Sequence, residues 1–165
     1  QVSSVATPED YKNPAEPVAI YSGQQLTALA DPLSKSGSTY AREVTFAYGS
    51  SCSAPPSGFT AALPGMLCKI TYPDASVTSL YYDANGQLAE VVDPGSAVSS
   101  FFYNSDGLLA GIGNTLANDE IMHEGVGTLP STMQKTIGYD SNGYATSVIL
   151  PAPDGVTAAD RPEKT

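Results

Sequence analysis

The segment Tyr82-Asp83-Ala84-Asn85-Gly86-Gln87-Leu88, followed by Val91, contains a pattern that recurs along the chain. The same order is found in Tyr103-Asn104-Ser105-Asp106-Gly107-Leu108-Leu109, followed by Ile112, and in Tyr139-Asp140-Ser141-Asn142-Gly143-Tyr144-Ala145, followed by Val148. A Tyr that ends one strand, an Asx-rich turn that closes on a Gly able to adopt positive φ, and an apolar start to the next strand describe a β-hairpin. The positions that define the repeat are Tyr82, Gly86, Leu88, Val91, Tyr103, Gly107, Leu109, Ile112, Tyr139, Gly143, Ala145 and Val148. The pattern predicts repeated antiparallel hairpins.

The rest of the chain extends this pattern. Alternation of apolar and polar residues, together with the turn signals, predicts strands at 42–48, 66–72, 77–83, 87–92, 97–103, 108–112, 133–139 and 144–150. A degenerate earlier copy at 26–32 matches residues 88–94 at Leu and at Asp-Pro. The segment Ala117 to Glu124 is predicted as a helix of about two turns, capped by Asn118, inside an insertion after the second copy.

Three segments resemble the YD repeats of the Rhs family, which is found in bacterial polymorphic toxins, insecticidal toxin complexes and teneurins. They are Ile70-Thr71-Tyr72-Pro73-Asp74, Tyr81 to Leu88, and Gly138 to Gly143. The third repeat departs from the family pattern by placing Ala145 where Leu is usual. The resemblance covers residues 20 to 150 and implies a section of a curved β-sheet that spirals into a hollow shell, often around a C-terminal toxin. We therefore expect an all-β fold with one short helical insertion.

The domain organisation follows from the limits of the repeat. Residues 1–17 contain three prolines and no apolar period, so they are predicted as an extended linker. Residues 18–150 are expected to form the repeat sheet, and 151–165 a tail that continues into the parent chain. Because the chain begins with Gln1, we expect a processed or excised piece of a longer polypeptide.

Composition excludes several classes of partner. The chain has 165 residues, and its formal net charge of −10 opposes binding to the phosphate backbones of nucleic acids and to anionic lipid. No run of 18 apolar residues occurs, so we expect no insertion into a membrane. Fifteen Gly, thirteen Pro and ten Tyr with no Trp are typical of a chain with many turns between short strands.

The two cysteines, Cys52 and Cys68, flank a loop rich in Ser, Pro and Gly. The favoured interpretation is a disulfide that closes this loop onto the strand at 66–72, with two reduced thiols as the alternative. A disulfide indicates an oxidising compartment. We therefore expect a protein that is secreted or located at the bacterial cell surface.

No motif for catalysis or cofactor binding is present. His123 is the only histidine, and its acidic neighbours favour a solvated surface role. Asp and Asn before the repeat glycines resemble half of a calcium loop, but the remaining ligands are missing and a turn is favoured. We therefore expect no enzyme activity, no cofactor and no metal site.

The aromatic residues leave an alternative open. Candidate glycan contacts are Tyr72, Tyr81, Phe102 and Tyr144, because aromatic rings beside Asn and Asp often bind sugars. A Tyr at a fixed place in each repeat is more simply explained by packing on the neighbouring hairpin, with its hydroxyl reaching a turn.

The expected function is that of a non-catalytic structural segment of an extracellular Rhs/YD-repeat protein. Its partners would be neighbouring repeats of the parent chain and an enclosed or displayed effector. A cell-surface adhesin or carbohydrate-binding module is the alternative, and a fragment of a carbohydrate-active enzyme is a weaker one.

Overall fold

The computed structural model describes residues 16–124 and 129–165, and for residues 121–124 it describes the backbone alone. Residues 1–15, which make up most of the linker predicted at 1–17, lie outside the described residues. The chain divides into two compact units, an N-terminal unit up to Gly86 and a C-terminal unit from Gln87. No helix in the described ranges is both long and apolar enough to cross a membrane.

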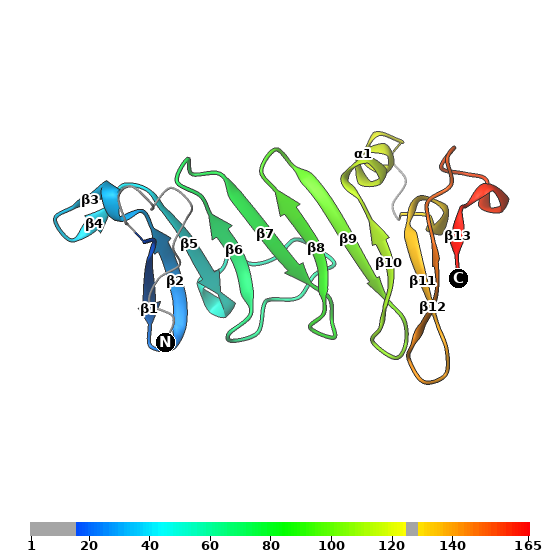
Figure 1. Cartoon of the computed structure of the whole chain (residues 1–165), viewed down its shortest axis with the longest axis horizontal. Coiled ribbons are helices and arrows are strands. Elements are labelled where there is room, and N and C mark those ends of the chain that lie inside the picture. Colours follow the sequence, from blue (N-terminus) through cyan, green and yellow to red (C-terminus); the bar gives the residue numbers. More distant parts are fainter. Residues whose placement is uncertain (1–15, 125–128) are drawn as a thin grey trace. The chain divides into compact units, whose positions relative to one another are not determined.

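The N-terminal unit is an antiparallel sheet whose strands lie side by side in chain order (Figure 1). Its strands are β1 (Val18–Ser22), β2 (Gln25–Ala30), β5 (Glu43–Tyr48), β6 (Leu67–Thr71) and β7 (Val77–Tyr82). A separate two-stranded ribbon, β3 (Lys35–Ser36) with β4 (Thr39–Tyr40), and the 3-10 turn η2 (Pro32–Ser34) lie between β2 and β5. A second 3-10 turn, η3 (Gly49–Ser51), opens the long connection to β6.

The C-terminal unit follows the same rule. Its strands are β8 (Leu88–Asp93), β9 (Ala97–Tyr103), β10 (Leu109–Gly113), β11 (Lys135–Tyr139), β12 (Ala145–Ile149) and β13 (Glu163–Lys164). The helix α1 (Thr115–Glu124) and the 3-10 turn η4 (Ser131–Met133) lie between β10 and β11, and η5 (Ala158–Asp160) precedes β13. Residues 151–165, expected as a tail, thus contribute β13, which pairs with β12.

The all-β prediction is confirmed, and the predicted strand at 97–103 coincides with β9. The predicted helix was wrong at its start, since α1 begins at Thr115 and Asn118 lies inside it. Asn114 is the capping residue, because its Oδ1 accepts the Ala117 N–H at 2.9 Å. The Asn118 side chain instead bonds Ser100 Oγ at 3.1 Å, holding α1 against β9.

The hairpin turns of the repeat are built as predicted. Asn104 Oδ1 accepts the backbone N–H groups of Asp106 and Leu108, and Asp140 Oδ1 accepts those of Asn142 and Tyr144. The glycines that close the three turns have positive φ, namely Gly86, Gly107 and Gly143. These Asx oxygens therefore order the turn backbone.

Neither unit has a deep core. No described residue has a large side chain that is less than 2% exposed. The buried apolar residues are Ala28, Ala30, Cys68, Tyr82, Leu129 and Ala152. Most strand positions are half-buried, as expected for thin sheets that need neighbouring structure to cover them.

Candidate functional site

Four tyrosines end strands of the two sheets, and all four make the same hydrogen bond. Each hydroxyl donates to a backbone carbonyl near the start of the preceding strand in its sheet. The pairs are Tyr48 with Leu26 (2.8 Å), Tyr82 with Leu67, Tyr103 with Leu88 (2.9 Å) and Tyr139 with Leu109 (2.8 Å). In each pair the acceptor lies opposite the residue that precedes the tyrosine, as the registers of the strand pairs require. We call this set the tyrosine series.

The tyrosine series ties the first strand of each repeat to the strand that precedes it in the sheet. The hydroxyl satisfies a carbonyl at the end of a strand, where the ladder of backbone hydrogen bonds stops. The expectation that the hydroxyl reaches a turn was wrong, because its acceptor belongs to the first or second residue of a strand. The pair formed by Tyr48 and Leu26 escaped sequence analysis because insertions lengthen the repeat on both sides of Tyr48.

Tyr82 is the most buried member of the series at 8% exposure. Burial raises the pKa of its phenol, because the charged form would lose its hydration. The hydroxyl therefore stays protonated and remains a donor to Leu67 at physiological pH. This is the behaviour of a structural tyrosine.

The apolar positions of the repeat lie inside paired strands. Val91 is opposite Ser99, Ile112 is opposite Phe101, and Val148 is opposite Ile137. All three are half-buried, whereas Ala145, opposite Tyr139, is exposed. Each of these repeat positions is thus paired with a residue of a neighbouring strand in the sheet.

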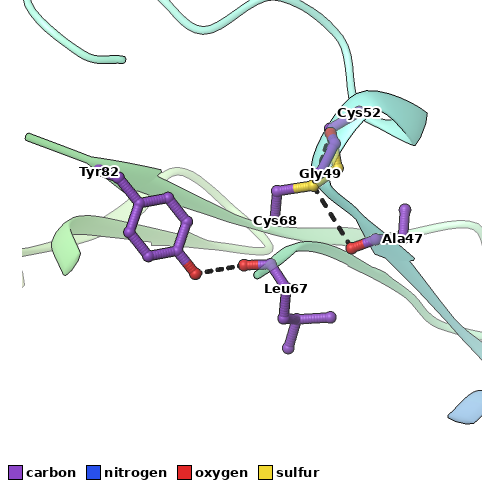
Figure 2. Close-up of a disulfide and its surroundings, with 6 residues drawn as sticks. All are labelled: Ala47, Gly49, Cys52, Leu67, Cys68 and Tyr82. Carbon is purple, nitrogen blue, oxygen red and sulfur yellow. Dashed lines mark hydrogen bonds between the residues drawn. A yellow bond between two sulfur atoms is a disulfide. The ribbon is translucent and has the colours of Figure 1, made fainter. Parts of the chain in front are cut away.

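The predicted disulfide between Cys52 and Cys68 is confirmed. Figure 2 shows it beside the contact of Tyr82 with Leu67, with Cys68 on β6 and Cys52 just after η3. Cys68 Sγ lies 3.4 Å from the Ala47 carbonyl oxygen. Since a disulfide sulfur carries no hydrogen, this is a packing contact. The bond closes a ring of residues 52–68, and we call the whole connection between β5 and β6, residues 49–66, the disulfide loop.

The disulfide loop is attached to the sheet at a second place. Phe59 stacks on Tyr81 with ring centroids 5.2 Å apart, and the Thr60 N–H donates to the Tyr82 carbonyl at 2.8 Å. Between the loop and strands β6 and β7 lies a cavity of about 370 Å³. Sequence analysis missed Phe59 and Thr60, because an irregular loop has no periodicity that would indicate its contacts.

Two of the four candidate glycan contacts, Tyr72 and Tyr81, lie in the N-terminal unit, and the other two lie in the C-terminal unit. The Tyr72 hydroxyl hydrogen-bonds Thr78 Oγ1 at 3.2 Å, and Tyr81 is covered by Phe59. In the C-terminal unit Phe102 is 36% exposed and Tyr144 is 71% exposed.

Titratable groups do not cluster in the described part of the chain. No group of three or more His, Cys, Asp or Glu that could hold a metal occurs among the described residues. Burial raises the pKa of Glu90, which lies on β8 opposite Ser100. His123 belongs to α1, and its side chain lies outside the described residues.

Comparison with known proteins gives one match. The family model described as RHS Repeat matches residues 82–118, from the tyrosine that ends β7 to the first turns of α1. No curated protein matches the chain.

Proposed function

We propose that this chain, whose residues 82–118 match the RHS Repeat model, is a non-catalytic wall segment of a larger extracellular protein of the Rhs/YD-repeat family. In this proposal its hairpins continue into neighbouring repeats of the parent chain. Together they form a curved shell or scaffold that encloses or displays a separate toxin or effector. The disulfide loop and α1 are local insertions in the wall.

The tyrosine series is the observation that carries the proposal. The tyrosines that recur in the repeats are engaged with the backbone of the preceding strand of the sheet. Their role is therefore mechanical. Few described side chains of either unit are fully buried, and this supports a wall segment with further repeats beside it. A row of hairpins is stable only when adjacent units cover its faces and edges.

The disulfide supports an extracellular location. Bonds such as Cys52–Cys68 persist in oxidising compartments and are rare in the reducing cytosol. The acidic composition supports a wall that does not adhere to nucleic acid or to anionic lipid.

Electron cryo-microscopy of the intact parent protein tests this proposal, with a parent that lacks its effector region as the matched control. We expect a closed shell that contains internal density, and the same shell without that density in the control. An open rod with both sheet faces in solvent would contradict enclosure.

A cell-surface adhesin is the second candidate, and the exposure of Tyr144 and Phe102 favours it. Glycan-array binding of the chain, compared with Tyr144→Ala and Phe102→Ala variants, tests it. Loss of a specific glycan signal at an unchanged melting temperature would favour the adhesin over the wall segment.

A further inference from the structure

We propose that the cavity beneath the disulfide loop binds a small monocarboxylate with an apolar body, such as an aromatic acid or a short fatty acid. The cavity lies wholly within the N-terminal unit and has a volume of about 370 Å³. This is within the range of sites that hold small organic ligands.

Five residues of two paired strands line the cavity, namely Cys68, Lys69, Ser79, Leu80 and Tyr81, and three of them share one face of the sheet. Lys69 on β6 is opposite Ser79 on β7, and Tyr81 is two residues further along β7. Cross-strand partners and residues two apart in a strand share one face of a sheet. All three are half-buried and line the cavity. A lysine, a serine and a tyrosine therefore share the face of the sheet that lines the cavity.

Lys69 is the only charged residue that lines the cavity among the described residues. Its ammonium has no hydrogen bond or ion pair within the described ranges. By contrast, Arg42 pairs with Asp31 at 2.5 Å, and Arg161 donates to the Gln134 carbonyl at 2.7 Å. An unpaired ammonium on a half-buried lysine favours an anionic ligand, and a single ammonium matches a single carboxylate.

The residues that form the walls of the cavity determine which kind of ligand body fits beside the carboxylate. The loop contributes small apolar residues and three hydroxyls to the lining, namely Ala54, Pro55, Ala61, Ala62 and Pro64, with Ser50, Ser53 and Thr60. Ala54 and Ala61 are exposed, so the loop side of the cavity opens to solvent, whereas the strand side is covered. The body of the ligand would therefore be apolar, with its carboxylate at Lys69. Because the disulfide also lines the cavity, the bond holds the walls in place.

Calorimetry and amide NMR on the oxidised 165-residue chain test the site, with 4-hydroxybenzoate and octanoate as probes. The uncharged control ligand for 4-hydroxybenzoate is 4-hydroxybenzamide. We expect saturable binding of at least one acid, with shifts at Ser79, Tyr81 and Thr60. The affinity for the amide should be lower by about tenfold or more, since the amide lacks the charge-assisted hydrogen bond.

Variants locate the carboxylate. Lys69→Met should weaken binding of the acid about tenfold or more. Lys135→Met, at an exposed position of β11, removes the same charge outside the cavity and should leave binding unchanged. Ser79→Leu fills the cavity from the strand side and should abolish binding. Reduction of the disulfide should weaken it.

Three results would overturn the proposal. They are the absence of binding by both acids, equal affinities for 4-hydroxybenzoate and its amide, and unchanged affinity in Lys69→Met. If Lys69→Met does not fold, the comparison of acid with amide on the unmodified chain still decides the question.

Discussion

The disulfide loop and the helical insertion at 114–134 each lengthen one connection between neighbouring strands, but they do so at different positions of the repeat. The disulfide loop connects β5 to β6, replacing the short Asx turn that elsewhere follows the strand-end tyrosine. The helical insertion connects β10 to β11, where the equivalent hairpin of β8 and β9 has a tight turn. One insertion is fastened by a covalent bond, and the other by packing on the sheet.

The two insertions also differ in the side chains of the strand that lies beneath each of them. Under the helical insertion the strand has glycines, since a Cβ at Gly111 would meet Gln134 and one at Gly113 would meet Leu129. Under the disulfide loop the strands keep full side chains, and a cavity remains. A cavity of about 300 Å³ also lies beside α1, lined by Leu116, Glu120 and Met133 among others, so the two insertions differ in the side chains of the strand below them and not in the presence of a gap.

Removal of the disulfide should have the largest effect and should be confined to the N-terminal unit. The cysteines are 16 residues apart, and a closed loop of this length contributes about 3 kcal/mol to stability. Denaturation of the oxidised and reduced chains gives the loss, and hydrogen exchange assigns it to a unit. Protection in the C-terminal unit should be unchanged.

The Cys52→Ser/Cys68→Ser double variant is the control for this experiment. It should be as unstable as the reduced chain and insensitive to added reductant. An equal loss of protection in both units would contradict the contrast between the two insertions.

Gly113→Val should have the next largest effect, in the C-terminal unit. The added side chain would displace Leu129, which is 9% exposed, and overpacking of this kind costs about 2 kcal/mol. Thr146→Val, at an exposed position of β12, is the matched control and should be nearly neutral. If chemical denaturation shows equal stabilities for the two variants, the insertion is not fastened by packing on glycine.

The regular part of this fold could be predicted from the sequence, as could the presence of the short helix and of the disulfide, whereas the contacts of the two insertions with the sheet could not. Alternation and turn chemistry placed β9 and the Asx turns, because both signals are local. The stacking of Phe59 on Tyr81 and the packing of Leu129 over Gly113 depend on contacts between distant, non-periodic segments. For the same reason the cavity at Lys69 was not predicted, since in sequence Lys69 is an ordinary outward position of a strand.

The tyrosine series should contribute equally in the two units, unlike the insertions. Tyr48→Phe in the N-terminal unit and Tyr139→Phe in the C-terminal unit each remove one hydroxyl that donates to a carbonyl. Each should cost about 1 kcal/mol, measured by denaturation. Tyr144→Phe, at a residue that is 71% exposed, should cost nothing measurable. A cost as large for Tyr144→Phe would mean that the series has no special role.

Ala75→Gly should stabilise the tight turn that joins β6 to β7. In the C-terminal unit the helical insertion occupies the equivalent connection, between β10 and β11. Ala75 has φ of +67°, a left-handed conformation that costs an L-residue roughly 1 kcal/mol. We therefore expect a gain of about 0.5 kcal/mol in the free energy of unfolding, after the added chain entropy of glycine. Ala84→Gly, in a turn without positive φ at that residue, should lower stability instead.

The smallest effect should be a dependence of stability on pH at Asp154, close to the helical insertion. The hydroxyl and N–H of Thr157 and the N–H of Val156 donate to the Asp154 carboxylate and lower its pKa to about 2. Because the folded pKa lies below the unfolded value, the stabilisation is present above pH 4 and is lost as the pH falls toward 2. Asp154 is fully exposed, so the loss should be small and confined to the C-terminal unit. Acid titration followed by NMR should show this, and in Asp154→Asn the stability of the 151–160 segment should no longer fall over that interval. An equal slope in the variant would assign the pH dependence to other carboxylates.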